Sequence, residues 1–451
     1  MVAIDRRLGY IFLGFLALLT VAVLRAVDLG VLRAGSLQQA AVSQQISNET
    51  TPAMRGTITD TNGVDLALSE SAADIIADPY LIKQPMVDAQ KLSPLVHLPV
   101  LTVLAGLTKP HTGYVRLAPQ VSSTVAHQVT ALNINGISTT PDVKRIYPRN
   151  WFAAQVLGDI NHLGNGYSGL ESLYNSTLLG RSGERRIVND ARGQTIAIDN
   201  VRQMQPGKTL RLTLSAPLQS EVEQVLAGVG ATYSPQSATA IVMNPNTGAI
   251  LALANWPRIN ANDPYAGAST ATVNNAIQDH AVSFTYEPGS TFKAITVAGA
   301  LQDGLITPST SFDIPPQLSV YGSTIRDADP HGYEPLTTAG ILRVSSNIGA
   351  DLIGQKLGAT RFNYWVHRFG FGAPTGVDLA GEDSGFILSP SKYSGTSMYN
   401  LPFGQGESVT PMQMAAAYAA IANGGWLRSP YIVQSVGGKA APVPKAHRII
   451  S

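Results

Sequence analysis

A serine and a lysine stand one helical turn apart in the stretch YEPGSTFK, which runs from Tyr286 to Lys293. A serine hydroxyl is a weak nucleophile at neutral pH, so it needs an adjacent base to remove its proton. Lys293 would face the same side of a helix as Ser290, and burial would lower the pKa of its amine. The Pro-Gly corner would expose the hydroxyl at a helix start, where backbone N–H groups can stabilise an oxyanion. We therefore expect Ser290 to be a nucleophile and Lys293 to be its base.

The S-x-x-K spacing alone is weak, because average residue usage gives about one or two examples by chance in a chain this long. A second example, Ser389 to Lys392, contains proline and lies in a loop-like stretch, and we interpret it as a decoy. Further along from Ser290, the triplet Ser345-Ser346-Asn347 adds a hydroxyl that could relay a proton and an amide that could bind a carbonyl. Serine and asparagine are also common turn and cap residues, so it is the order of the two motifs that points to catalysis.

The chain that must position these residues has 451 residues, enough for two or three domains. Charged residues make up 14% and hydrophobic residues 44%, which favours a sizeable core. The net charge of +1 gives no basic surplus for nucleic acid. There is no cysteine, and no two histidines have H-x-x-x-H spacing, so we expect neither a metal site nor a cofactor.

The segment Leu8 to Leu24 carries no charge and nearly spans the hydrocarbon core of a bilayer. Arg6 and Arg7 precede it, which predicts a cytoplasmic N-terminus and an exported remainder. A cleaved signal peptide is the alternative, but no small-x-small cleavage site follows. We expect a single-pass anchor.

Hydrophobic patterns predict the elements around the motifs. The stretch from Arg55 to Ser69 indicates a hairpin with an Asn-Gly turn. Leu218, Val222, Val225 and Leu226 are spaced for one buried face of a helix. Two apolar runs around Pro245 to Gly248 predict an antiparallel hairpin in a buried sheet, so a new domain starts near residue 206. Thr410, followed by Pro411, predicts a helix start that leads to Gly424 just past the end.

With these features the chain resembles the class B penicillin-binding proteins, the monofunctional transpeptidases of bacterial cell-wall synthesis. The segments that carry the resemblance are RGTITDTNG, RIYPRNWFAAQVLG, GLESLYNSTLLG, AIVMNPNTGAILALANWP, YEPGSTFK, SSN, FGFG and GQGESVTPMQMAAAYAAIANGG. The resemblance implies an α+β chain with a cytoplasmic tip and transmembrane anchor (1–34) and an exported, mixed α/β pedestal of the dimerisation type (35–205). A transpeptidase domain with an antiparallel sheet and helices on both sides would follow (206–451).

The resemblance also implies a reaction, which is D,D-transpeptidation through a serine acyl-enzyme on peptidoglycan stem peptides ending in D-Ala-D-Ala. Ser290 would attack the carbonyl between the two D-alanines, with Lys293 as base and Ser345 as proton relay. Asn347, with Ser346, would hold the donor peptide. The motif Gly404-Gln405-Gly406 would lie near the cleft and contact substrate or support it. β-Lactams mimic the donor and would acylate Ser290.

The implied location is the bacterial inner membrane. The implied partners are lipid II-derived glycan with its stem peptides, β-lactams, a polytopic glycosyltransferase and division proteins, with no nucleic acid. The stretch IRDADPHG and the first domain favour the septal over the elongation subgroup. The polar loop from Arg326 to Pro335 could border the cleft, and Arg55 and Glu171 match family positions at which we expect structural contacts.

One departure from the family pattern is a missing motif. Members carry K-T-G or K-S-G after the segment that matches GQGESVTP, and no such motif follows here. The stretch Lys392 to Thr396, KYSGT, is similar to K-S-G, but it precedes Gly404 and has an extra residue after the lysine, so we do not accept it as the motif. The missing strand would supply an oxyanion donor that typically contributes about 3 kcal/mol. The sequence is therefore interpreted either as a C-terminally truncated transpeptidase or as a catalytically dead scaffold tethered in the division or elongation machinery. A β-lactam sensor or serine β-lactamase would also use S-x-x-K, but would not need the long exported segment before residue 206.

Overall fold

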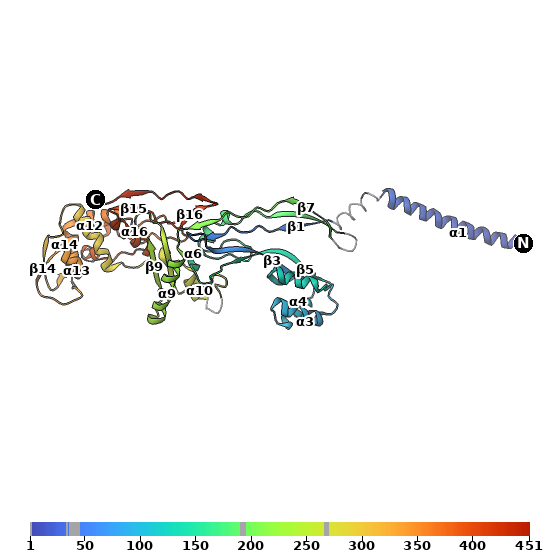
Figure 1. Ribbon diagram of the computed structural model, residues 1–451, viewed down its shortest axis with the longest axis horizontal. Helices are drawn as coiled ribbons and strands as arrows, with labels where there is room; N and C mark the ends of the chain where they lie inside the picture. Colours follow the sequence, from blue (N-terminus) through green and yellow to red (C-terminus); the bar gives the residue numbers. More distant parts are fainter. Residues whose placement is uncertain (1, 33–34, 36–45, 190–194, 266–269) are drawn as a thin grey trace. The chain divides into compact units, whose positions relative to one another are not determined.

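The computed structural model describes residues 2–32, 35, 46–189, 195–265 and 270–451. The described chain mixes helices and strands (Figure 1), as the α+β prediction requires. It divides into two compact units, each assembled from segments that are apart in the sequence. Unit 1 comprises Met1–Ala53, Ser71–Val143 and Arg181–Gln205, and unit 2 comprises Met54–Glu70, Lys144–Gly180 and Pro206–Ser451. The three-part division at residues 34/35 and 205/206 stays a prediction.

The N-terminal helix α1 (Val2–Val27) continues into a short π-helix, η1 (Asp28–Leu32). The 24 residues from Gly9 to Leu32 contain an 18-residue window with a mean hydropathy of 2.2, and none of that window is buried. At 1.5 Å per residue this length exceeds the ~30 Å of a bilayer core. The helix is therefore long and apolar enough to cross a membrane.

The remainder of unit 1 has two parts. Strands β1 (Ile46–Thr51), β6 (Gly183–Asn189) and β7 (Thr195–Arg202) form an antiparallel sheet in the order β1-β6-β7. The second part packs α3 (Pro85–Val96), α4 (Val100–Leu107) and α5 (Ser123–Ala131) around β4 (Val115–Ser122), β5 (Ile137–Ile146) and the later half of β3 (Asp65–Ala77). Its core contains Ile75, Leu92, Val103 and Val129, which are at most 1% exposed.

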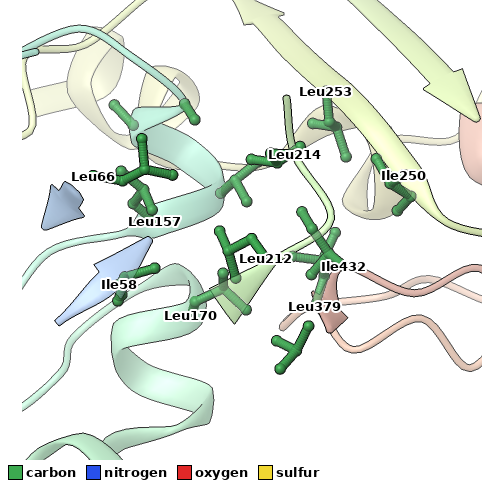
Figure 2. Packing of buried hydrophobic residues seen from close by; sticks show 14 of the residues in the cluster. Ile58, Leu66, Leu157, Leu170, Leu212, Leu214, Ile250, Leu253, Leu379 and Ile432 are labelled. Carbon is green, nitrogen blue, oxygen red and sulfur yellow. The ribbon is translucent and has the colours of Figure 1, made fainter. Parts of the chain in front are cut away.

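The first core of unit 2 lies around a sheet with the order β17-β16-β8-β2-β3. The alternation of Leu210, Leu212 and Leu214 predicts a half-buried strand, and all three side chains are fully buried on and after β8 (Leu210–Leu212). Figure 2 shows Leu212 and Leu214 near Ile58 and Leu66 from the early hairpin, Leu157 and Leu170 from the middle segment, and Ile250 and Ile432 from later segments. Three stretches of unit 2 therefore share one core.

The two predicted hairpins are present. Strand β2 (Ile58–Thr59) pairs antiparallel with β3 across the Asn62-Gly63 turn, where Gly63 has a φ of +87°. Strand β9 (Ala238–Met243) pairs antiparallel with β10 (Ile250–Trp256), and helix α9 (Ala216–Tyr233) packs on β10.

The predicted buried face of α9 is wrong in part, because Val225 is 63% exposed while Gln219 and Glu223 are buried. The buried polar side chains have partners that replace water. Gln219 donates to the Leu253 carbonyl and accepts from the Leu253 N–H, both at 2.7 Å. Glu223 accepts from the Ala153 N–H at 2.6 Å and from Arg258 at 2.8 Å. These hydrogen bonds satisfy the buried polar groups, so this polar face of the helix can lie in the interior.

A second core in unit 2 contains Phe292, Ile353, Phe362, Phe371 and Ala417. It is formed by α12 (Lys293–Gln302), α13 (Thr338–Val344), α14 (Asn347–Leu357), α15 (Ala359–Arg368) and α16 (Pro411–Ala422), with the small strands β11 (Ser311–Ile314) and β14 (Glu334–Thr337). Thr410 begins α16 with a capping box to Gln413, as its predicted N-cap role requires. The other described elements of unit 2 are α6 (Ala154–Leu157), α7 (Gly169–Leu173), α8 (Asn175–Leu178), α10 (Thr270–Ile277), α11 (His280–Ser283), η2 (Gly289–Phe292), β12 (Leu318–Val320), β13 (Ser323–Ile325), η3 (Pro390–Lys392), η4 (Ser397–Tyr399), η5 (Leu401–Phe403), β15 (Trp426–Arg428), β16 (Val433–Val436), β17 (Lys439–Ala440) and β18 (Ala446–Arg448).

Arg55 and Glu171 meet inside unit 2, where Glu171 is fully buried between Arg55 and Arg145. Arg145 also donates to the carbonyl of Gly56 at 2.9 Å, and Arg55 donates to Asn175 at 2.8 Å. A buried carboxylate with two guanidinium partners is costly to break, since removing one partner strands a charge. The cluster ties the residue 54–70 segment to the residue 144–180 segment.

Candidate active site

The corner that carries Ser290 is held from both sides by backbone. Tyr286 and Val409 exchange two backbone hydrogen bonds of 3.0 and 2.9 Å, and the Gly289 N–H donates to the Gly404 carbonyl at 2.9 Å. Gly289 has a φ of +55°, which lets the chain turn sharply after Pro288. The Ser290 side chain is exposed and makes no hydrogen bond within the described part of the chain. The corner therefore presents a free hydroxyl, as predicted.

The turn that follows differs from the predicted α-helix start. Ser290 lies on the 3₁₀ turn η2, and the α-helix α12 begins at Lys293. Side chains three residues apart tend to eclipse in a 3₁₀ turn, but within the described residues no hydrogen bond joins Ser290 to the Lys293 amine, which donates only to Ser345 and Asn347. The lysine is only 1% exposed, although the serine lies at the surface.

The Lys293 amine is surrounded by the S-x-N triplet. Nζ donates to the Ser345 carbonyl at 2.5 Å, to the Ser345 Oγ at 3.1 Å and to the Asn347 Oδ1 at 2.7 Å. An ammonium has three N–H donors, so these acceptors use all of them. When Lys293 is the neutral amine, the Ser345 hydroxyl can turn and donate to its lone pair. The structure thus brings together three of the predicted catalytic and binding residues, with Ser290 at the surface one turn before the lysine.

Burial lowers the pKa of Lys293 from 10.5 to about 8, while the carboxylates of Asp327 and Asp351 act against this shift. About a tenth of the lysine is then the free amine at pH 7, against less than about a thousandth for an unperturbed lysine. Water exclusion around the amine is therefore what makes a base available near neutral pH.

Ser345 and Asn347 owe their positions to a break between two helices. Ser345 follows α13 with a φ of +58°, a left-handed conformation that few non-glycine residues adopt. Helix α14 begins at Asn347, and the three helices α12, α13 and α14 lie close together in Figure 1. The break projects the Ser345 carbonyl and hydroxyl and the Asn347 amide toward one amine.

Ser346 points the other way and is fully buried. Its hydroxyl accepts from the Gly349 N–H at 2.8 Å and donates to Asp327 at 2.6 Å, so it caps α14. Because this hydroxyl already donates and accepts within the protein, it is not free to make the substrate contact predicted for Ser346. We propose that its role is to anchor the start of α14.

Asp327 organises the triplet, a role that the sequence analysis did not assign to it. Its carboxylate accepts from the Asn347 and Ile348 N–H groups at 2.6 and 3.0 Å, in addition to Ser346. The preceding carbonyl, of Arg326, accepts from the Asn347 Nδ2 at 2.9 Å. This fixes the amide so that Oδ1 faces Lys293. The loop containing Asp327 was expected only to border the cleft, and no local sequence signal connects it to the triplet, because β14 and α13 lie between them.

The Gly404-Gln405-Gly406 segment packs behind the serine corner. A Cβ added to Gly404 would lie 2.3 Å from the Gly289 carbonyl oxygen, so no side chain fits there. Gly406 donates its N–H to Glu287 at 2.9 Å, and Gln405 is exposed. These contacts give the two glycines a supporting position against the corner.

The second S-x-x-K has none of these contacts. Ser389 precedes the 3₁₀ turn η3 and Lys392 is its last residue. Both are exposed, and the Ser389 hydroxyl contacts only that of Ser391, at 3.0 Å. No group of three potential metal ligands gathers in the part of the chain that the structure describes. Of the two S-x-x-K motifs, the one at Ser290 is therefore the one whose lysine is buried among acceptors.

Comparison with known proteins identifies the family of the chain. Residues 238–451 match the family described as the penicillin binding protein transpeptidase domain, and residues 50–212 match the penicillin-binding protein dimerisation domain. The chain is 30% identical to penicillin-binding protein PbpB of Mycolicibacterium smegmatis, over 97% of this chain and 72% of that protein. It is 30% identical to the peptidoglycan D,D-transpeptidase FtsI of Buchnera aphidicola, over 84% of this chain and 66% of that protein.

A solved structure is similar over most of the chain. Penicillin binding protein 3 from Mycobacterium tuberculosis, complexed with ampicillin, superimposes with a TM-score of 0.66 at 26% identity, over 89% of this chain and 72% of that one. The apolar N-terminal helix and these relatives together indicate a membrane-anchored protein. The chain belongs to the class B penicillin-binding proteins, and Ser290, Lys293, Ser345 and Asn347 all lie within its transpeptidase domain.

Proposed function

We propose that this protein is a serine D,D-transpeptidase that cross-links peptidoglycan stem peptides ending in D-Ala-D-Ala. The observation that carries the proposal is the buried Lys293 amine, bonded to Ser345 and Asn347 and one turn after the exposed hydroxyl of Ser290. The relatives named as peptidoglycan transpeptidases support the same reaction.

The proposed first half-reaction forms an acyl-enzyme. The amine of Lys293 takes the proton of the Ser290 hydroxyl as the Ser290 oxygen bonds to the penultimate D-alanine carbonyl carbon. The resulting oxyanion faces the Ser290 N–H. The proton passes from Lys293 through the Ser345 hydroxyl to the leaving nitrogen, the C–N bond breaks, and D-alanine departs. Asn347 holds the donor peptide beside the amine.

The second half-reaction transfers the peptide. An amine from a neighbouring stem peptide attacks the ester carbonyl and loses a proton to Lys293, and the Ser290 oxygen leaves with a proton to restore the hydroxyl. A β-lactam follows the first half-reaction, because its amide carbonyl takes the place of the donor carbonyl. The ring nitrogen stays attached after the C–N bond breaks, so it does not leave as D-alanine does.

The chain's location follows from its anchor and its substrate. We assign residues 1–34 to a cytoplasmic tip and inner-membrane anchor, residues 35–205 to an exported pedestal and residues 206–451 to the transpeptidase domain. Arg6 and Arg7 before the apolar helix favour a cytoplasmic N-terminus. A polytopic glycosyltransferase that supplies lipid II-derived glycan and septal division proteins are the expected partners.

A fluorescent penicillin tests the proposal directly. The wild-type chain should be labelled covalently, and digestion should place the adduct on the peptide containing Ser290. S290A should remove the label, whereas S389A, which alters the second S-x-x-K, should retain it. A labelled S290A protein would overturn the assignment of the nucleophile. An unlabelled but folded wild-type protein would favour the alternative of a tethered scaffold without catalysis.

A further inference from the structure

Asp351 is a buried acid that the proposed reaction does not use. It lies on α14 and is fully buried, and neither carboxyl oxygen has a hydrogen-bond partner within the described residues. Burying an ionised carboxylate without donors costs far more than burying the neutral acid. A group of this kind needs a nearby cation to ionise at all.

The cation that acts electrostatically on Asp351 is the lysine of the candidate active site, Lys293. Asp351 lies one turn after Asn347 on α14, so the two side chains share a face of the helix, and Asn347 accepts from Lys293 at 2.7 Å. Helix α12, which carries Lys293, packs against α14. The ammonium donors are already used by Ser345 and Asn347. Asp351 and Lys293 can therefore interact through charge but without a hydrogen bond.

Two groups act electrostatically on Asp351 in the described structure, and they oppose each other. Lys293 on α12 favours its ionisation, while Asp327, in the loop after β13, disfavours it. Asp327 has four hydrogen-bond partners of its own, including His331 at 3.1 Å, whereas Asp351 has none within the described residues. Lys293 is therefore the partner whose charge can change together with that of Asp351.

We propose that Asp351 and Lys293 form a charge-coupled pair, in which Asp351 is a positioning residue that sets the pH at which Lys293 becomes the free amine. The buried site accepts either two neutral groups or an ammonium with a carboxylate, and it disfavours a lone carboxylate most. The proposal rests on the proposed function, since the amine is the base for Ser290.

The titration behaviour supports this pairing. Burial raises the pKa of Asp351 to about 9, and the charge of Lys293 pulls it down. Burial lowers the pKa of Lys293 to about 8, and Asp351 pushes it up. Because the two values lie close together, the pair loses its protons in two shared steps. Part of the singly deprotonated population keeps the proton on Lys293, where it cannot serve as base.

The first test is the pH profile of β-lactam acylation. D351N keeps the shape of the neutral acid but cannot ionise, so the pH midpoint should fall by about half a unit and the rate at pH 7 should rise about threefold. D329N removes an exposed carboxylate from the loop after β13 and should leave the midpoint in place. A D351N midpoint equal to wild type would overturn the proposal, and D351S provides a second, smaller replacement.

The second test needs no catalysis. Thermal unfolding of wild type, D351N, K293M and the double variant gives the coupling from pH 5 to pH 9. D351N should raise Tm, and by more at pH 8 than at pH 5, because the unfolded chain ionises Asp351 and the folded chain does not. At pH 9 the gain should be larger in the K293M background. Equal gains in both backgrounds at every pH would refute the pair, whereas coupling without acylation would leave the pair standing and count against the proposed function.

Discussion

Two stretches of this chain have the same S-x-x-K spacing, and only one of them is built into a site. At residues 290–293 the serine is exposed on a supported corner and the lysine is 1% exposed among three acceptors. At residues 389–392 both the serine and the lysine are exposed, and the serine hydroxyl contacts only that of Ser391. The difference teaches that the spacing selects candidates, while burial of the amine decides which lysine can act as a base.

The largest expected difference between the two motifs appears when each lysine is replaced in turn. K293M should lower the rate of penicillin acylation about 10²–10⁴-fold, the usual contribution of a general base, and K392M should stay within about twofold of wild type. The measurement is stopped-flow or gel-based labelling against time. Similar losses in both variants would erase the distinction between the two motifs.

The pH dependence of acylation tests whether the buried lysine of the first motif is the base. Because Lys293 must be the amine, acylation should rise roughly 50-fold from pH 6 to pH 8 and level off above its pKa of about 8. The pKa is lowered from 10.5 by folding, so the unfolded chain binds more protons on this lysine between these values. The contribution of Lys293 to stability should therefore rise with pH across that window, and Asp351, with a pKa of about 9, opposes it in the lower part. A flat acylation profile would mean that a different group removes the serine proton.

The packing of Gly404 against the corner that carries Ser290 can be tested by substituting the glycine. G404A places a methyl group 2.3 Å from the Gly289 carbonyl, which should cost about 1–3 kcal/mol of unfolding free energy beyond backbone strain. G381A is the matched control, since Gly381 has a φ of +79° but nothing within 4 Å of the added carbon. Denaturant unfolding should rank G404A clearly below G381A, and equal losses would argue against a tight contact at the corner.

The smallest expected effect concerns the shell around the lysine. D327N removes the charged acceptor that holds the start of α14, and should lower acylation about tenfold because Asn347 and Ser345 lose their fixed orientation. D329N in the same loop should acylate like wild type. If D327N unfolds more readily but acylates normally, Asp327 stabilises the helix without positioning the base.

The parts of the fold with strong local signals were predictable from sequence. The Asn62-Gly63 turn, the β9–β10 hairpin and the Thr410 cap all follow from short patterns, and all are present. The choice of Ser290 over Ser389 followed from its Pro-Gly corner and the S-x-N triplet, and the geometry agrees with it, although the residues' roles remain proposals.

Features decided by tertiary partners could not be predicted. Val225 looked buried by helical spacing, but Gln219 and Glu223 occupy the inner face because distant backbone groups satisfy them. Asp327 comes well before the triplet in sequence, and only the fold brings its carboxylate to the start of α14. The 3₁₀ turn at Ser290 likewise begins at Gly289, whose N–H donates to the carbonyl of Gly404, a residue far away in the sequence.

The shared core of unit 2 has a practical consequence for dissecting the protein. A fragment cut at residue 206 would begin at the sequence boundary of the last segment, but it would lack Ile58, Leu157 and Leu170, which fill the space beside Leu212 and Leu214 (Figure 2). It would also lose β2, the parallel neighbour of β8. Such a fragment would leave an open hydrophobic face and a bare strand edge, so recombinant work on the catalytic half should keep residues 54–70 and 144–180 on the same polypeptide.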